Sequence, residues 1–136
     1  MQKDETIFVA GHRGMVGSAI HGKLRGDGFS KVIGRTRKEL DLLDRAAVRA
    51  FFEKERPDIV IDAAAKVGGI LANYEQPVEF LVQNLTIQNT LIEAAADFGT
   101  RKLLFLGSSC IYPKMAPQPI PESALLTGPL EDTNDA

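Results

Sequence analysis

The sequence predicts an α/β fold, a doubly wound parallel sheet that reaches about four strands within these 136 residues. Short apolar runs rich in β-branched and aromatic residues, typical of strands buried on both faces, alternate with longer stretches of helical periodicity. Strands that alternate with helices in this way are joined by right-handed crossovers. Neighbouring strands are therefore expected to be parallel.

The first half of the chain predicts the order strand, helix, strand, helix. Apolar residues 7–9 stop at a glycine and predict the first strand, and residues 15–27 gather their apolar side chains on one helical face. A short second strand is expected at 31–34, followed by a basic turn. The second helix is expected to begin after Asp44, whose side chain can cap it, and to end at Pro57.

The second half predicts two more strands around a long helix. Residues 58–62 form the third expected strand, and the small residues of 66–70 predict a loop. A Gln-Pro pair marks the start of a helix over 78–97, and the fourth strand is expected at 102–107. From residue 114 to 136 repeated prolines predict a loop without helix or strand.

Three glycines spaced three residues apart join the first strand to the first helix. Gly11 permits the sharp turn off the strand, Gly14 leaves room for a phosphate, and Gly17 lets the helix pack close to the strand. Free N–H groups at the start of a helix attract anions. The motif therefore favours a dinucleotide-binding site on a Rossmann-type sheet over a plain tight turn.

Basic residues follow the second strand, where NAD-binding proteins usually carry an acidic residue for the ribose hydroxyls. Gly34 and Arg35 occupy this position, Arg37 follows closely, and Arg13 lies inside the glycine loop. Guanidinium groups suit the 2′-phosphate of NADP, which an acid would repel. The charge pattern favours NADP over NAD, and a solvated basic turn is the alternative.

Two further segments are candidates for the adenosine side of this site. Asp41 and Leu42 can approach an adenine amino group, although Asp41 taken on its own is better explained as a residue that starts the second helix. Ala63, Ala64 and Ala65 follow the third strand, where small residues leave room for a flat ligand. Simple packing of the sheet against a helix explains the alanines nearly as well.

The segment after the fourth strand carries the candidate catalytic groups. A hydroxyl at Ser108 can bond a carbonyl substrate, and the thiol of Cys110 can move a proton if its pKa is lowered. A turn with a half-buried cysteine is the alternative. His12 and His21, the only histidines, are expected to be a scaffolding residue and a surface residue. The sequence shows no metal-ligand spacing and no motif for Ser/His/Asp hydrolysis.

Four stretches follow a pattern shared with a known group of enzymes, namely residues 11–17, 35–37, 63–70 and 104–114. Together they resemble the extended short-chain dehydrogenase/reductases, and more narrowly the GDP-L-fucose synthases within that family. The resemblance covers nearly the whole chain. It implies an NADPH-dependent enzyme that converts GDP-4-keto-6-deoxy-D-mannose to GDP-L-fucose by epimerisation and reduction.

The resemblance also implies a cofactor, NADP(H), a GDP-sugar substrate, and a homodimer for the full-length family member. The helix over 78–97 would contribute an apolar stripe to the dimer. Two alternatives remain open. One is another sugar-nucleotide epimerase/reductase of the same superfamily, and the other is a non-catalytic dinucleotide-binding module.

Roles for individual residues follow from the same resemblance. Ser108 would bond the 4-keto oxygen of the substrate, and Cys110 would exchange protons with the carbons next to that ketone. Arg13 and Arg37 would meet the 2′-phosphate, with Arg35 near the adenine. The full set of expected cofactor-binding residues is Gly11, Arg13, Gly14, Met15, Val16, Gly17, Arg35, Arg37, Asp41, Leu42, Ala63, Ala64 and Ala65.

The resemblance places the family's Tyr-x-x-x-Lys, a partner histidine and the sugar-binding domain beyond Ala136. We therefore expect residues 1–113 to be an NADP-binding core and 114–136 a proline-rich loop leading to the remainder of the enzyme. The chain is expected to be the cofactor-binding, amino-terminal part, and to be inactive alone.

Composition limits the possible partners and compartment. A net charge of −2 gives no electrostatic reason to expect nucleic acid or a membrane surface as a partner. No stretch is long and apolar enough to span a bilayer. Cys110 is the only cysteine, so no internal disulfide can form, which fits a reducing compartment. A cytoplasmic protein is expected.

Overall fold

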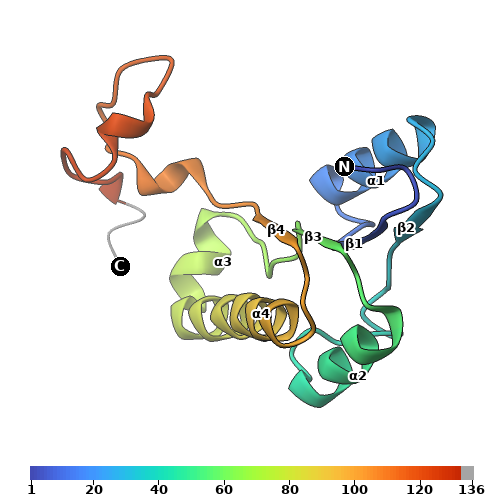
Figure 1. The fold of residues 1–136 in the computed structure, drawn as a ribbon. Helices are drawn as coiled ribbons and strands as arrows, with labels where there is room; N and C mark the ends of the chain where they lie inside the picture. Colours follow the sequence, from blue (N-terminus) through green and yellow to red (C-terminus); the bar gives the residue numbers. More distant parts are fainter. Residues whose placement is uncertain (133–136) are drawn as a thin grey trace. The chain divides into compact units, whose positions relative to one another are not determined.

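The computed structural model describes residues 1–132. In this part of the chain one parallel sheet contains β1 (Thr6–Ala10), β2 (Lys31–Ile33), β3 (Ile59–Asp62) and β4 (Lys102–Phe105), in the order β2-β1-β3-β4 (Figure 1). All three strand pairs are parallel. The chain leaves β1 toward β2 on one side and later returns to β3 on the other, so the direction of winding reverses between β1 and β3. The predicted fold class is confirmed.

Helices cover both faces of this sheet, which explains why its central strands are apolar without interruption. Ile7 and Val9 of β1 point to the face covered by α1 (Met15–Gly26), where Ile20 and Leu24 pack against them. Phe8 of β1 belongs to the opposite face. That face is covered by α2 (Arg45–Glu55) and α4 (Pro77–Asp97), through Val48, Phe52, Leu91, Ala94 and Ala95.

The predicted ends of the second helix are confirmed by its caps. The carboxylate of Asp44 accepts hydrogen bonds from the N–H groups of Ala46 and Ala47, both at 3.0 Å. At the other end Arg56 adopts a left-handed conformation with φ of 47°, immediately before Pro57. The cap at Asp44 marks the start of the helix. The left-handed Arg56 and the proline after it end the helix.

The described chain divides into two compact units. The first consists of residues 1–67 and 78–106 and contains the sheet; the second consists of residues 68–77 with the segment from 107 onward. Within the second unit, Lys114 forms an ion pair with Glu131 at 2.9 Å, and its N–H donates to the carbonyl of Pro129 at 3.0 Å. These contacts give the proline-rich segment a defined conformation.

Short helices in the second unit were not predicted. A helix, α3 (Ile70–Glu75), follows the predicted loop at 66–70, and 3-10 turns occur at Ser109–Ile111 and Glu122–Ala124. The prediction of a tail without helix was therefore wrong for 122–124. Residues 133–136 of the predicted loop lie outside the described residues, and the boundary between residues 113 and 114 stays a prediction.

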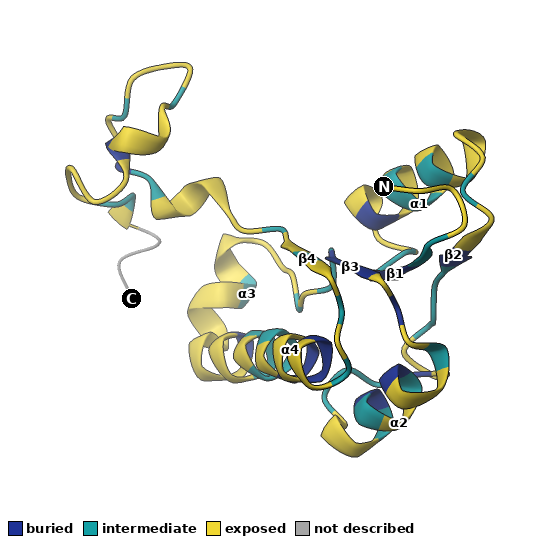
Figure 2. Cartoon of the chain, viewed as in Figure 1, coloured by how far each residue is buried: buried dark blue, intermediate teal, exposed yellow. Residues whose placement is uncertain are grey.

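One face of α4 carries apolar side chains that remain exposed. They recur at helical spacing, and Figure 2 shows α4 exposed on the side away from the sheet. The residues are Val78, Leu81, Val82, Leu85 and Ile92. None of the helices in the described residues is both long enough and apolar enough to cross a membrane. Within the same residues no cluster of three or more potential metal ligands occurs.

Candidate functional site

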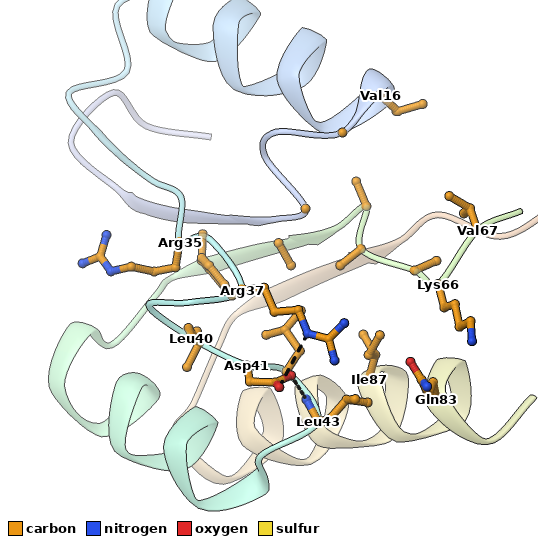
Figure 3. Close-up of a pocket in the computed structure, with 18 of the residues that line it drawn as sticks. Val16, Arg35, Arg37, Leu40, Asp41, Leu43, Lys66, Val67, Gln83 and Ile87 are labelled. Carbon is orange, nitrogen blue, oxygen red and sulfur yellow. Dashed lines mark hydrogen bonds and ion pairs between the residues drawn. The ribbon is translucent and has the colours of Figure 1, made fainter. Parts of the chain in front are cut away.

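A cavity of about 930 Å³ lies in the first unit (Figure 3). Its walls come from the loop after β1, the segment after β2, the turn after β3, and α4. This is the point where the winding of the sheet reverses, the usual position of ligands in doubly wound sheets. Most residues predicted for cofactor binding line it, namely Gly11, Gly14, Met15, Val16, Arg35, Arg37, Asp41, Leu42, Ala63, Ala64 and Ala65.

The glycine loop tolerates no side chain at two of its three glycines. Gly11 has a φ of +73°, and a Cβ there would lie 2.6 Å from the carbonyl oxygen of Ala63. A Cβ on Gly17 would lie 2.1 Å from the carbonyl oxygen of Gly11. Gly14 is exposed and immediately precedes α1, whose first residues line the cavity. The helix start therefore offers its positive dipole end at the cavity wall.

The two arginines after β2 are oriented differently (Figure 3). Arg35 extends away from the cavity, and its guanidinium binds the carboxylate of Glu55 and its neighbouring carbonyl at Gly34, both at 3.0 Å. Arg37 extends into the cavity, where its guanidinium lies 3.6 Å from the carboxylate of Asp41. Arg37 is therefore the arginine available to a ligand, and Arg13 is exposed without lining the cavity.

Asp41 lies in the cavity wall and does not cap a helix. Its Oδ1 accepts a hydrogen bond from the N–H of Leu43 at 3.0 Å, and Asp44 caps α2 instead. Leu40 is buried in the core beside it, and Leu42 packs against the same core. The segment thus presents one fixed carboxylate and an apolar surface, which suits a polar aromatic ring such as a purine.

The alanine turn after β3 is held from two sides by polar groups. The N–H of Ala64 donates to Oδ1 of the buried Asp62 at 3.0 Å. From α4, the amide of Asn84 accepts from the N–H of Lys66 at 2.7 Å and donates to its carbonyl at 3.1 Å. Burial raises the pKa of Asp62, and the hydrogen bond from Ala64 opposes that shift. These contacts fix the turn against the sheet and the helix.

Sequence reasoning missed the contribution of α4 to this site. Glu79, Gln83 and Ile87 line the cavity and are spaced four residues apart, which places them on one face of the helix. Lys66 also lines it, with its ammonium group paired to Glu79 and 4.8 Å from the ring of Phe80. The four-residue spacing of the polar residues Glu79 and Gln83 was the signal that could have identified this face.

The candidate catalytic residues belong to the second unit. Ser108 precedes a 3-10 turn, and its Oγ accepts a hydrogen bond from the N–H of Cys110 at 3.1 Å. Both residues are exposed, so the half-buried cysteine considered from the sequence is not observed. Ser108, Cys110, Arg13 and Gly17 are not among the residues that line the cavity. Their roles stay predictions.

A glycine turn that leads into a helix, at the winding reversal of a parallel sheet with a cation nearby, defines a Rossmann-type dinucleotide-binding protein. Residues 7–135 match the NAD dependent epimerase/dehydratase family. The chain belongs to that family, as the sequence pattern had indicated.

Two of the relatives that resemble this chain are named as GDP-L-fucose synthases. The chain is 60% identical over 135 residues to a putative GDP-L-fucose synthase of Arabidopsis thaliana, covering 99% of this chain and 41% of the relative. It is 56% identical over 131 residues to the GDP-L-fucose synthase of Escherichia coli, covering 96% and 41%. The chain thus spans about two fifths of the length of these relatives.

A solved structure supports the same relationship. The GDP-mannoheptose reductase MlghC from Campylobacter jejuni, with NADP bound, superposes with a TM-score of 0.89 at 38% identity. The match covers 98% of this chain and 42% of that one. The expected family and fold are therefore confirmed by independent comparisons.

Proposed function

We propose that the chain is the cofactor-binding part of an NADPH-dependent epimerase/reductase that converts GDP-4-keto-6-deoxy-D-mannose to GDP-L-fucose. The observation that carries this proposal is the cavity in which the glycine turn, the guanidinium of Arg37 and the alanine turn after β3 meet. The names of relatives at 56 to 60% identity support the choice of substrate.

The residues present fit NADP(H). Because Gly11 and Gly17 have no Cβ, the turn packs closely against the backbone after β3 and the first turn of α1, which brings the start of α1 to the cavity, where it would bind a pyrophosphate. Arg37 would hold the 2′-phosphate, Asp41 and Leu42 would flank the adenine, and the alanine turn would border the adenosine. When bound, NADPH supplies the hydride that reduces a ketone.

Ser108 is suited to orient the substrate carbonyl. Because its Oγ already accepts the N–H of Cys110, its own proton is free to be donated to a keto oxygen. Such a hydrogen bond polarises the ketone and makes the neighbouring carbon protons more acidic. The thiol of Cys110, exposed and two residues away, would remove or return one of these protons during epimerisation.

The exposed face of α4 supports a homodimer. Val78, Leu81, Val82 and Leu85 follow the spacing of an apolar stripe on one side of a helix. Exposed apolar stripes of this kind commonly mark association surfaces. Sedimentation of the chain beside a Leu85→Glu variant tests the interface, since only the unsubstituted chain is expected to dimerise.

The cytoplasmic location expected from the sequence remains part of the proposal.

A second candidate is a reductase that acts on a different GDP-sugar. The similarity to a GDP-mannoheptose reductase favours it, because the dinucleotide site would be the same and only the sugar would differ. Parallel assays with both GDP-keto-sugars on the full-length enzyme would separate the two candidates.

Titration of the chain with NADPH and NADH tests the cofactor assignment. We expect NADPH to bind at least about tenfold more tightly, because hydrogen bonds between charged groups contribute roughly 1.5 to 3 kcal/mol. Equal weak binding of both nucleotides would contradict the proposal. The chain alone is expected not to turn over the keto sugar, and steady NADPH oxidation with that substrate would show that it is more than a cofactor-binding part.

A further inference from the structure

One face of α4 forms a wall of the cavity to which the proposed function gives no role. Three residues of this face line the cavity at a spacing of four, namely Glu79, Gln83 and Ile87. The next position on the face, Leu91, is buried in the same core cluster as Leu40, which directly precedes Asp41. The cavity face of α4 and the segment expected to hold the adenine therefore border the same end of the cavity (Figure 3).

Apolar side chains at this end suit the flat faces of a purine. Leu42, Ala64 and Ile87 line the cavity, and each also packs against that core cluster. Figure 3 shows Ile87 rising from α4 toward the cavity. Apolar walls of this kind contact the faces of a base, whereas its edge is recognised by a few polar groups. At this end of the cavity Asp41 and Gln83 carry hydrogen-bonding side chains that can meet such an edge.

The carboxylate of Glu79 determines how the amide of Gln83 is oriented. Nε2 of Gln83 donates a hydrogen bond to Oε1 of Glu79 at 2.8 Å. The ammonium group of Lys66 also donates to Glu79, and its hydrogen bond and charge lower the pKa of that carboxyl group. An ionised carboxylate accepts hydrogen bonds but donates none, so the amide nitrogen must face Glu79. The amide oxygen of Gln83 is left to accept a hydrogen bond from a ligand in the cavity.

We propose that Gln83 is a specificity-determining residue whose Oε1 accepts a hydrogen bond from the 6-amino group of the cofactor's adenine; this rests on the proposed function. The amino group has two hydrogens, and the carboxylate of Asp41 is the expected acceptor of one of them. The amide oxygen of Gln83 accepts the other. Guanine and hypoxanthine carry a carbonyl oxygen at the same position, which neither acceptor can bond. The two side chains together select adenine.

The test is a titration of the chain with NADPH and with its hypoxanthine analogue, in which a carbonyl oxygen replaces the 6-amino group. The unsubstituted chain should bind the analogue at least about tenfold more weakly, because two acceptors then face an oxygen. Gln83→Met keeps the length of the side chain and removes the acceptor. We expect the dissociation constant for NADPH to rise about three- to tenfold, the range of one hydrogen bond. The dissociation constant for the analogue should stay constant or fall.

Gln88→Met is a matched control. Gln88 belongs to the same helix and is partly buried, as Gln83 is. It is not among the residues that line the cavity. The same chemical change at this position should alter the dissociation constant of neither nucleotide.

The analogue distinguishes recognition of the base from a purely structural role of Gln83. An equal loss of NADPH and analogue binding in Gln83→Met would mean that the side chain only shapes the cavity wall, and it would overturn the proposal. Unchanged discrimination in this variant would assign base selection to Asp41 alone and would also overturn it, as would reduced discrimination in Gln88→Met.

The unsubstituted chain shows whether the proposed function itself fails. If it binds NADPH and the analogue equally well, the adenine contact of Gln83 is wrong while the cofactor assignment stands. If it binds neither NADPH nor NADH, the proposed function is wrong and the role of Gln83 falls with it.

Discussion

The imidazole ring of His12 lies directly against the backbone of Gly34, so that a Cβ at residue 34 would be 2.3 Å from His12 Cγ. His12 belongs to the glycine loop after β1, and Gly34 immediately follows β2. Among the described residues Nδ1 of His12 is buried without a hydrogen-bond partner, and its ring lies 5.5 Å from that of His21. The contact therefore couples the expected pyrophosphate loop to the segment that carries Arg37.

Gly34→Ala is expected to destabilise the protein by about 1 to 3 kcal/mol, the usual cost of overpacking. The added methyl group would overlap the inner atoms of the imidazole ring, which cannot move aside without moving the glycine loop. Urea unfolding measures the change. In the Gly34→Ala, His12→Ala double variant the clash is gone, so its cost should be clearly smaller than the sum of the single costs. Strict additivity would argue against the contact.

Gly17→Ala should be far more damaging than Gly22→Ala in the same helix. A Cβ on Gly17 would lie 2.1 Å from a backbone oxygen of Gly11, whereas a Cβ on Gly22 meets no atom within 4 Å. We expect Gly17→Ala to reduce NADPH affinity at least about tenfold, because the turn must open. Gly22→Ala should raise the free energy of unfolding by about 0.5 to 1 kcal/mol, through helix propensity alone. Similar behaviour of the two variants would contradict the tight turn.

The sheet and its helices could be predicted because their signals are local. The unbroken apolar run at Ile7–Val9, the three glycines and the cap at Asp44 depend on neighbours within a few residues. The different orientations of Arg35 and Arg37 could not be predicted, because Arg35 is held by Glu55, twenty residues further on. The α3 helix escaped detection because six residues after two glycines carry too little periodicity.

Arg37→Met and Arg35→Met should separate the two arginines. Arg37→Met is expected to weaken NADPH binding by about ten- to a hundredfold with little change for NADH, since it removes a charged contact to the 2′-phosphate. Arg35→Met should affect NADPH less, and it should lower stability because it leaves Glu55 without its partner at 3.0 Å. Calorimetric titration gives both affinities. A larger loss of NADPH binding in Arg35→Met would mean that Arg35 turns into the cavity when the nucleotide binds.

Asp62→Asn is expected to stabilise the protein at neutral pH and to lose this advantage in acid. Burial raises the pKa of Asp62, so the folded state holds its proton more tightly than the unfolded state does. The stability that the folded state gains by binding this proton is complete below the pKa of Asp62 in the unfolded chain, near 3.8. It is lost as the pH rises through the pKa of Asp62 in the folded state. Asparagine keeps an acceptor for the N–H of Ala64 without the buried charge, so the difference between variant and wild type should grow from acid to neutral pH. Urea midpoints measured for both proteins across this range check the expectation, and a difference that is constant with pH would show that Asp62 does not titrate as its burial requires.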